Sequence, residues 1–145
     1  MPVFQELLSN HILKVTLLAW ATAQLLKVII VLLTQKKWDF TRLVGAGGMP
    51  SSHSALVTSL AVGVGKDLGF NSSGFALAFT ITMVVMYDAA GVRRAAGMQA
   101  EVLNQILDDF YHAEFNRERL KELLGHTPTE VLAGAALGIT MGALF

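Results

Sequence analysis

Residues 12–33 read ILKVTLLAWATAQLLKVIIVLL, an almost unbroken apolar run. Its length matches the roughly 20 residues that an α-helix needs to cross a lipid bilayer. Lys14 lies near one end of the run, where its side chain can reach the headgroups, whereas Gln24 and Lys27 lie deep inside it. Their spacing of three residues places Gln24 and Lys27 on one helical face, which we expect to point into protein.

The composition agrees with a single membrane domain spanning residues 1–145. Hydrophobic residues make up 53% of the chain and charged residues 15%, and the formal net charge is zero. A neutral chain gives no general electrostatic reason to bind nucleic acid, so we expect no nucleic-acid partner. The chain has no cysteine, which excludes disulfides, thiolate chemistry and cysteine zinc sites.

Three more apolar segments follow, at residues 54–65, 75–92 and 131–145, and the first and last of these are short for a full crossing. Between the last two, residues 99–125 carry apolar side chains at helical spacing, with acidic residues on the other side. A second short helix is predicted within this stretch, over residues 116–125. The sequence therefore predicts an all-α integral membrane protein, with about four transmembrane helices in a small bundle plus an interfacial amphipathic helix.

Gly134, Gly138 and Gly142 repeat at four-residue spacing in the last segment. Such a face of small residues allows close helix packing in lipid. Because four helices, two of them short, make a thin bundle, we expect a homodimer. The glycine face is then either its seam or a contact within one protomer.

The basic residues divide between two sides if the four helices alternate across the membrane. Lys14 and Lys66 share one side. The other side has Lys36, Lys37, Arg42, Arg93, Arg94, Arg117, Arg119 and Lys121. By the positive-inside tendency, the second group faces the cytoplasm. We expect the protein in a bacterial plasma membrane.

The string GGMPSSHS at residues 47–54 places glycines and a proline before two hydroxyls and a histidine that open an apolar helix. Backbone amides, the positive end of the helix dipole and the hydroxyls of Ser51 and Ser52 make such a helix start suited to an anion. The simpler interpretation is a helix N-cap followed by an unrelated histidine, His53.

A second string, GHTPTE at residues 125–130, begins the last helix. Thr127 and Glu130 have capping-box spacing with Pro128 at the first helical position, which explains Glu130 without catalysis. His126 has no such explanation. A histidine beside a carboxylate can donate one ring N–H to it and keep its other nitrogen free for nucleophilic attack.

The two strings together resemble the motifs of the type 2 phosphatidic acid phosphatase superfamily, which includes vanadium haloperoxidases, and most closely its short divergent membrane branch. In that pattern Lys27 corresponds to the phosphate-binding lysine and Pro50-Ser51-Ser52-His53 to the Pro-Ser-Gly-His motif. Arg93 or Arg94 corresponds to the arginine. The resemblance covers the chain from about residue 24 onward.

The third motif, His-x-x-x-Asp, corresponds to His126 through Glu130, with glutamate in place of aspartate. Ser52 replaces the glycine of the second motif, and no Lys-x6-Arg-Pro motif is present unless Arg42 supplies its arginine. The arginine that precedes the histidine in the family lies closer in sequence than Arg94 does, and Arg119 is nearer to that spacing.

The resemblance implies a mechanism in which His126 attacks phosphorus to give a phosphohistidine that water then hydrolyses. His53 would protonate the leaving alkoxide, and Glu130 would orient His126. The expected phosphate ligands are Lys27, Ser51, Ser52, Arg93 and Arg94. Neither a metal nor another cofactor is then needed. Further pocket residues would be Gln24, Asp88, Gln99 and Arg119.

Several functions remain open from the sequence. The preferred one is a membrane lipid phosphatase acting on a lipid phosphate monoester or pyrophosphate, of the phosphatidylglycerophosphate, phosphatidic acid or polyprenyl phosphate type. The alternative is a non-catalytic subunit that binds lipid headgroups or packs against a partner helix. An anion or lipid transporter would need gating helices that this chain supplies only as an oligomer. Lys27 has its own alternative, an ion pair with Asp88 or Glu101, because an unpaired lysine at the bilayer centre costs roughly 3 kcal/mol.

Overall fold

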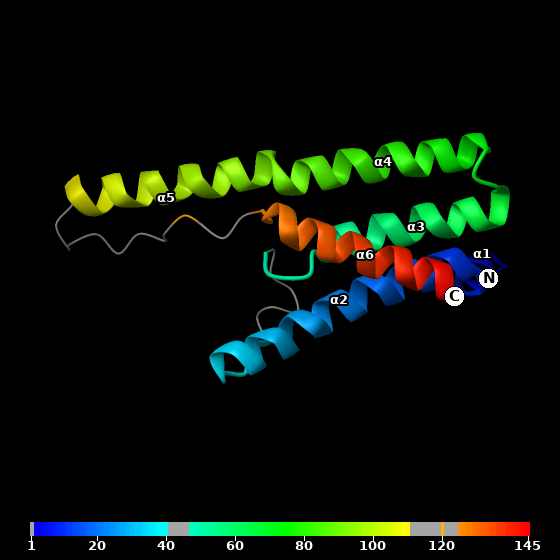
Figure 1. The fold of residues 1–145 in the computed structure, drawn as a ribbon, viewed down its shortest axis with the longest axis horizontal. Helices are drawn as coiled ribbons and strands as arrows, with labels where there is room; N and C mark the ends of the chain where they lie inside the picture. Colours follow the sequence, from blue (N-terminus) through cyan, green and yellow to red (C-terminus); the bar gives the residue numbers. More distant parts are fainter. Residues whose placement is uncertain (1, 41–46, 111–119, 121–124) are drawn as a thin grey trace.

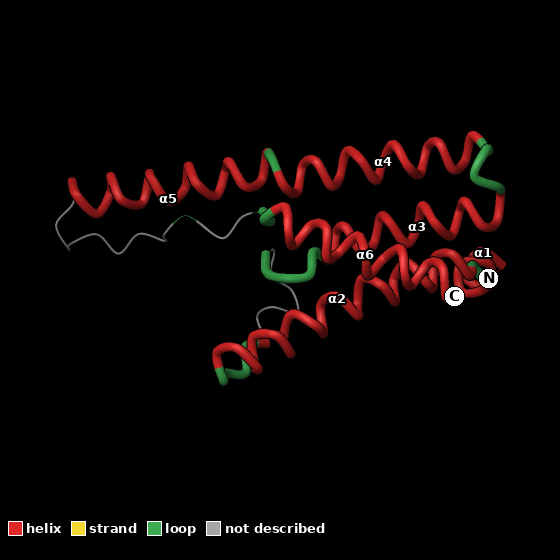
Figure 2. The backbone as a smooth tube through the Cα atoms, viewed as in Figure 1, coloured by secondary structure: helices red, strands yellow, loops and turns green. Residues whose placement is uncertain are grey.

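The computed structural model describes residues 2–40, 47–110, 120 and 125–145. Within these residues the chain forms α-helices and no strand, which confirms the all-α prediction (Figures 1 and 2). The helices are α1 (Pro2–Ser9), α2 (His11–Gln35), α3 (Ser52–Leu68), α4 (Ser73–Ala90), α5 (Val92–Phe110) and α6 (Pro128–Leu144).

Polar side chains fix where the main helices begin. Asn10, Ser51, Ser72 and Thr127 each take the N-cap position and accept a hydrogen bond from a backbone N–H in the first turn that follows. These bonds satisfy amides that have no carbonyl partner within the helix. The two strings singled out in the sequence therefore do begin helices, α3 and α6.

Two helical stretches in the described residues are long and apolar enough to cross a membrane, α2 and the run of α4 with most of α5. Helices α3 and α6 have 17 residues each. A helix of that length spans about 25 Å, slightly less than a typical hydrocarbon core. Crossings by α2 and by the run of α4 and α5 thus meet the length requirement, and those by α3 and α6 remain predictions.

Helix α3 lies at the centre of the bundle and contacts α2, α4 and α6. Helices α3 and α6 begin at the end of the bundle toward which α2 and α4 run, as Figure 1 shows. We call this the motif end, and the opposite end, with the α3–α4 turn and the last residues of α6, the far end. Many core side chains are small, and the buried alanines are Ala19, Ala23, Ala55, Ala61, Ala78, Ala89, Ala100 and Ala135. Small residues let helix backbones approach closely.

The glycine face of α6 packs against α3 within one protomer. A Cβ atom added at Gly138 would lie 2.1 Å from Thr58 Oγ1 and 2.2 Å from the carbonyl oxygen of Ala55. At Gly134 it would lie 2.2 Å from the carbonyl oxygen of Ser51. The contact within one protomer is therefore the one observed, and this face is not available as a dimer seam.

Helices α4 and α5 follow one another as a long rod along one side of the molecule (Figure 1). Gly91 separates them, so Arg93 and Arg94, which directly follow the predicted apolar segment at 75–92, lie in the first turn of α5. The predicted amphipathic helix starts earlier than expected for the same reason. Its apolar residues Val102, Leu103 and Ile106 are exposed, which agrees with an amphipathic helix. The second helix predicted at 116–125 falls mainly outside the described residues.

Candidate active site

Ser51 is the N-cap residue of α3. Ser51 is fully buried, and its hydroxyl oxygen accepts hydrogen bonds from Ser54 N (3.3 Å) and Ser54 Oγ (3.0 Å). Ser51 therefore caps α3, and its own O–H is not used in these two bonds. The amides of Ser52 and His53, in the first helical turn, have no carbonyl partner within the helix and remain suited to an anion.

Lys27 reaches this helix start from α2. Its side chain is buried, and Nζ lies 3.4 Å from the hydroxyl oxygen of Ser52. The aliphatic part of Lys27 passes Gly48, where an added Cβ atom would lie 3.9 Å from Lys27 Cδ. Gln24 is also buried, one turn earlier on the same helix. The prediction that Gln24 and Lys27 face protein is confirmed, and Lys27 meets the serine-histidine string.

His126 is held by the capping box of α6. One carboxylate oxygen of Glu130 accepts hydrogen bonds from Thr127 N (2.9 Å) and from His126 Nδ1 (3.3 Å). The hydroxyl of Thr127 in turn accepts from Glu130 N at 3.3 Å. Glu130 therefore makes both contacts considered for it, because the same oxygen caps the helix and accepts from the imidazole. The carboxylate assigns the proton to Nδ1 and leaves the lone pair of Nε2 available.

The other ring nitrogen of His126 is buried and has no hydrogen-bond partner among the described residues. The whole residue is only 3% exposed. Buried polar atoms are almost always paired, so an unpaired one calls for an explanation. A ligand atom that approaches Nε2 is the explanation that fits a nucleophile.

His53 lies in α3 and His126 lies just before α6, and the two rings come together. Their ring centroids are 6.3 Å apart and the planes are inclined by 61°. Two imidazoles at this distance can both reach one tetrahedral group placed beside them. The mechanism expected from the sequence requires this proximity of the two rings.

The backbone of three helices fixes this arrangement. His126 N donates to the carbonyl oxygen of Ala89 at the end of α4 (2.9 Å), and Ser51 N donates to the carbonyl oxygen of Glu130 (2.9 Å). Gly125, with φ of +92°, lies directly on the start of α5: a Cβ atom there would be 2.4 Å from Arg94 N. Only glycine tolerates both the left-handed conformation and this contact.

The sequence alone did not reveal this support. We predicted Gly125 as the glycine that ends a preceding helix, and its positive φ is consistent with a glycine-specific position. Its contact with the backbone of Arg93 and Arg94, however, joins residues far apart in the chain. No local signal in a single sequence reports such a contact.

Arg93 and Arg94 differ in which of their groups contact the site. Arg93 Nε donates to Asp88 Oδ2 at 2.6 Å, and its charge acts on both histidines. Arg94 is exposed, and its backbone rather than its side chain supports Gly125. Gln99 is exposed on α5, six residues after Arg93. Arg119 and Arg42 lie outside the described residues.

The environment of His126 favours its neutral form. Burial lowers the pKa of His126 below the ordinary value for histidine, the hydrogen bond with Glu130 opposes this shift, and the charges of Lys27 and Arg93 add to it. A lowered pKa leaves Nε2 unprotonated near neutral pH, as a nucleophile requires.

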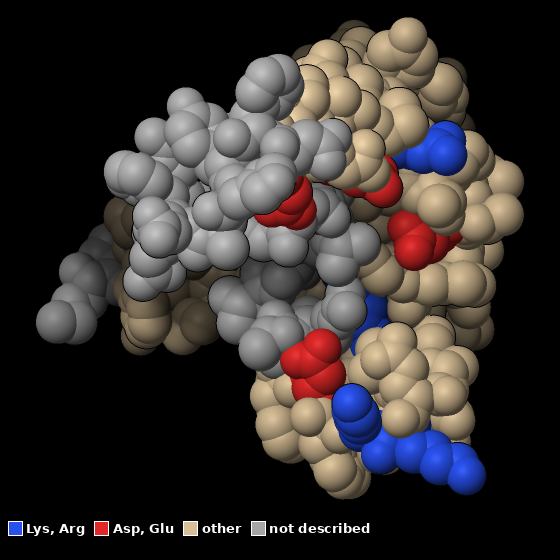
Figure 3. Space-filling model, turned by 90° about the vertical axis from the view of Figure 1, so that its left-hand side faces the viewer, with Lys and Arg blue, Asp and Glu red and all other residues tan. Residues whose placement is uncertain are grey.

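Charged side chains of both signs gather at the motif end (Figure 3). In the described parts of the chain, no three histidine, cysteine or acidic side chains lie close enough together to hold a metal ion. The donors that do gather here, an ammonium, a guanidinium, a hydroxyl and two imidazoles, are those that bind and transfer a phosphoryl group.

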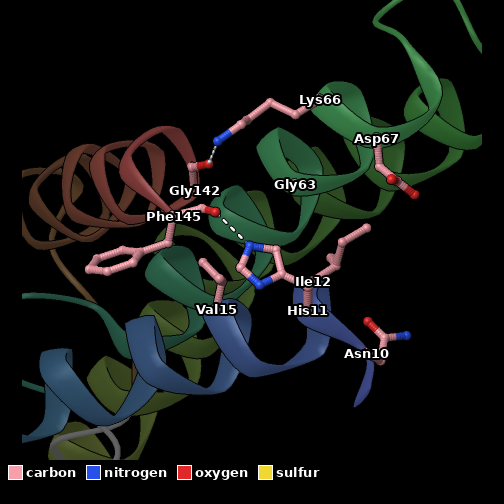
Figure 4. Close-up of a pocket in the computed structure, with 9 residues that line it drawn as sticks. All are labelled: Asn10, His11, Ile12, Val15, Gly63, Lys66, Asp67, Gly142 and Phe145. Atoms are coloured by element: carbon pink, nitrogen blue, oxygen red, sulfur yellow. Dashed lines mark hydrogen bonds between the residues drawn. The ribbon is translucent and has the colours of Figure 1, made fainter. Parts of the chain in front are cut away.

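A separate cavity of about 420 Å³ lies at the far end, between the start of α2 and the ends of α3 and α6 (Figure 4). Lys66 reaches across it and donates to the carbonyl oxygens of Gly142 (3.2 Å) and Ala143 (2.9 Å). His11 Nε2 is hydrogen-bonded to the carbonyl oxygen of Phe145. These contacts satisfy the end of α6, and none of the predicted site residues lines this cavity.

Comparison with known proteins shows which family the chain belongs to. It is 43% identical over 148 aligned residues to the uncharacterized membrane protein YuiD of Bacillus subtilis (strain 168), and the alignment covers 94% of each chain. No solved structure matches it. The Divergent PAP2 family matches residues 8–141, which include both histidines and every other predicted site residue. The chain is therefore a member of the Divergent PAP2 family of membrane proteins.

Proposed function

We propose that the protein is a membrane lipid phosphatase that works through a phosphohistidine on His126. The observation that carries the proposal is the buried Nε2 of this histidine, which lacks a partner among the described residues and lies beside the ring of His53. Membership of the Divergent PAP2 family supports descent from a phosphatase. The geometry of His53 and His126 supports the proposal that this chain still catalyses phosphoryl transfer.

In the first step, Nε2 of His126 attacks phosphorus in line with the ester oxygen. The N–P bond forms as the P–O bond breaks, and protonated His53 gives its proton to the leaving alkoxide. The imidazole of His126 becomes cationic when it is phosphorylated, and Glu130 stabilises that charge through Nδ1–H.

In the second step, water attacks the phosphohistidine. Neutral His53 takes a proton from the water, the N–P bond breaks, and inorganic phosphate leaves. Throughout, Lys27, Arg93 and the amides at the start of α3 stabilise the charge on the phosphoryl oxygens. Ser52, beside Lys27, supplies a further donor.

The substrate class follows from the location of the site. Lys27 lies two turns before the end of α2, below the exposed Lys36 and Lys37. A phosphate that reaches Lys27 enters beneath the headgroup level, while its acyl or prenyl chains stay in the bilayer. Phosphatidylglycerophosphate, phosphatidic acid and polyprenyl phosphate or pyrophosphate are the substrates we propose.

We further propose four crossings, by α2, α3, α4 and α6, with the motif end at the cytoplasmic face, and a homodimer. Because the glycine face is occupied within the protomer, the dimer would use the exposed apolar side of α4, which includes Leu77, Phe79, Met83 and Val84. A mass measurement in detergent that finds only monomer would contradict the dimer.

Phosphate release from purified protein tests the catalytic proposal. The wild type, presented with the three lipid classes in mixed micelles, should release phosphate from at least one of them. His126→Ala and His53→Ala should reduce the rate by at least about 1,000-fold and 100-fold respectively, as expected for a nucleophile and a general acid. If no lipid is hydrolysed and His126→Ala leaves lipid binding unchanged, the alternative of a non-catalytic lipid-binding subunit holds.

A further inference from the structure

Asp88 and Arg93 form a short ion pair across the α4–α5 junction. Arg93 Nε donates to Asp88 Oδ2 at 2.6 Å, and Gly91 lies between the two residues. Their side chains are 39% and 47% exposed. An ion pair this open to solvent adds little to stability, so its main consequence is geometric.

The hydrogen bond to Asp88 uses Nε of Arg93 and does not involve the two terminal nitrogens of the guanidinium. A guanidinium has five N–H donors in a fixed plane, and fixing Nε sets the direction of the other four. A Cβ atom added to Gly125, the residue before His126, would lie 2.7 Å from the carbonyl carbon of Arg93. Arg93 therefore begins close to His126, and its bond to Asp88 limits how the guanidinium can turn.

The same α4–α5 junction also contacts the backbone at His126, the proposed nucleophile. Ala89, the residue after Asp88, accepts the backbone hydrogen bond of His126, and Gly125 rests on the backbone of Arg93 and Arg94. One turn of α4 and one turn of α5 therefore set the positions of the histidine and of the arginine together.

We propose that Asp88 is a positioning residue that aims the guanidinium of Arg93 at the phosphoryl oxygens between His53 and His126. This proposal rests on the proposed function and adds a residue to it. The sequence had offered Asp88 as a pocket residue or as the partner of Lys27, whereas the structure pairs it with Arg93.

The sign of the effect distinguishes positioning from simple electrostatics. Asp88→Asn removes a negative charge near a site for anions, which by Coulomb's law alone should strengthen anion binding. Positioning predicts the opposite, because an arginine that loses its partner no longer presents its donors in a fixed direction.

Orthovanadate is a suitable probe because it adopts the trigonal bipyramidal geometry of phosphoryl transfer and does not require turnover. Titration calorimetry on the purified wild type, Asp88→Asn, Asp88→Glu, Arg93→Ala and Arg93→Lys measures its affinity. We expect Asp88→Asn to weaken binding by about 10- to 100-fold and Asp88→Glu to restore part of the loss. Arg93→Lys keeps the charge but lacks the fork, so it should resemble Arg93→Ala.

Two controls make the result specific. Asp67→Asn removes an exposed carboxylate at the far end and should leave vanadate affinity unchanged. The double variant Asp88→Asn, Arg93→Ala should bind no more weakly than Arg93→Ala alone, because Asp88 acts through Arg93.

Equal or tighter vanadate binding by Asp88→Asn, or additive losses in the double variant, would overturn the positioning role. If the wild type binds vanadate with the expected variant pattern but hydrolyses no lipid, the positioning role stands and the phosphatase proposal fails. If the wild type does not bind vanadate at all, both fail.

Discussion

Glu130 is shared by two donors at the start of α6, the backbone N–H of Thr127 and Nδ1 of His126. Glu130→Gln keeps an oxygen for one of these donors but removes the charge that stabilises a cationic imidazole. We expect the rate of phosphate release to fall by about 100- to 10,000-fold, as it does when the carboxylate of a catalytic triad is replaced by an amide. Steady-state kinetics in mixed micelles measure this loss.

Thr127→Ala is the matched control for Glu130→Gln. It deletes the hydroxyl that accepts from Glu130 N but leaves the contact between the carboxylate and His126. The variant should lose about 0.5–2 kcal/mol of stability, as N-cap deletions do, while its rate stays within a few-fold of wild type. Equal rate losses in the two variants would show that Glu130 serves only the cap.

His126 should make stability depend on pH. Burial lowers its pKa in the folded protein, so as pH falls below about 6.5 the unfolded chain takes up a proton before the folded protein does. The unfolded state then binds more protons, and stability decreases until pH reaches the folded-state pKa. Above about 6.5 both states are neutral at this residue and it has no effect.

Melting temperatures of the wild type and of His126→Gln, recorded from pH 7.5 to 4.5, isolate this contribution. All other titrating groups are common to both proteins, so the difference between the two curves reports His126. We expect the wild type to lose more stability than His126→Gln below pH 6.5. Parallel curves would mean that the folded environment does not lower the pKa of His126.

At the scale of single residues, the sequence predicted which residues belong to the site better than it predicted which residues bond to one another. The two histidines, Lys27 and Ser52 were chosen from local strings, and the structure brings them together. Ser51 was assigned to phosphate, and the structure adds a second role, because its oxygen accepts the N-cap hydrogen bond of α3 while its O–H is not used in that bond. The pairing of Asp88 with Arg93 depends on a helix break that the local pattern did not reveal.

Among the helices, the contact between α3 and α6 determines how closely His53, in α3, approaches His126, just before α6. At Gly138, an added Cβ atom would meet a backbone oxygen of α3 at 2.2 Å, so the helices would have to separate. Gly138→Ala should therefore destabilise the protein by about 1–3 kcal/mol, although alanine favours the isolated helix. Thermal unfolding in detergent gives the measurement.

Gly142→Ala provides a graded comparison, because its nearest contact would be 2.9 Å, to a side-chain carbon of Val62. It should cost less than Gly138→Ala. Ala136→Ser, on the exposed side of α6, should change stability by no more than about 0.5 kcal/mol. A Gly138→Ala protein as stable as the wild type would mean that the two helices are not in close contact.

The apolar segments located most of the helices because continuous hydrophobic runs survive in a single sequence. Helix α1 was not predicted, since Pro2–Ser9 is too short to show a clear period. The boundary between α4 and α5 was misplaced because apolar residues continue on both sides of Gly91 and only the glycine marks the change. The predicted apolar segment at 75–92 ended just before Arg93 and Arg94, whereas both residues lie in the first turn of α5.

The whole molecule has two ends of different character. The motif end gathers both histidines, Lys27 and Arg93, and the far end has the cavity that Lys66 and His11 border. Because α2 is long enough to cross a bilayer between these ends, we expect them on opposite membrane faces. The excess of basic residues at the motif end then favours its cytoplasmic placement.

The absence of native cysteine allows this topology to be tested with single introduced thiols. Gln35→Cys at the end of α2 and Asn71→Cys in the α3–α4 turn both replace exposed neutral residues, so neither alters the charge distribution that orients the chain. In intact cells a membrane-impermeant maleimide should label Asn71→Cys at once and Gln35→Cys only after permeabilisation. The reverse pattern would place the site on the outer face and favour substrates of the outer leaflet. Labelling of both thiols from one side would mean that α3, the helix between them, does not cross the membrane.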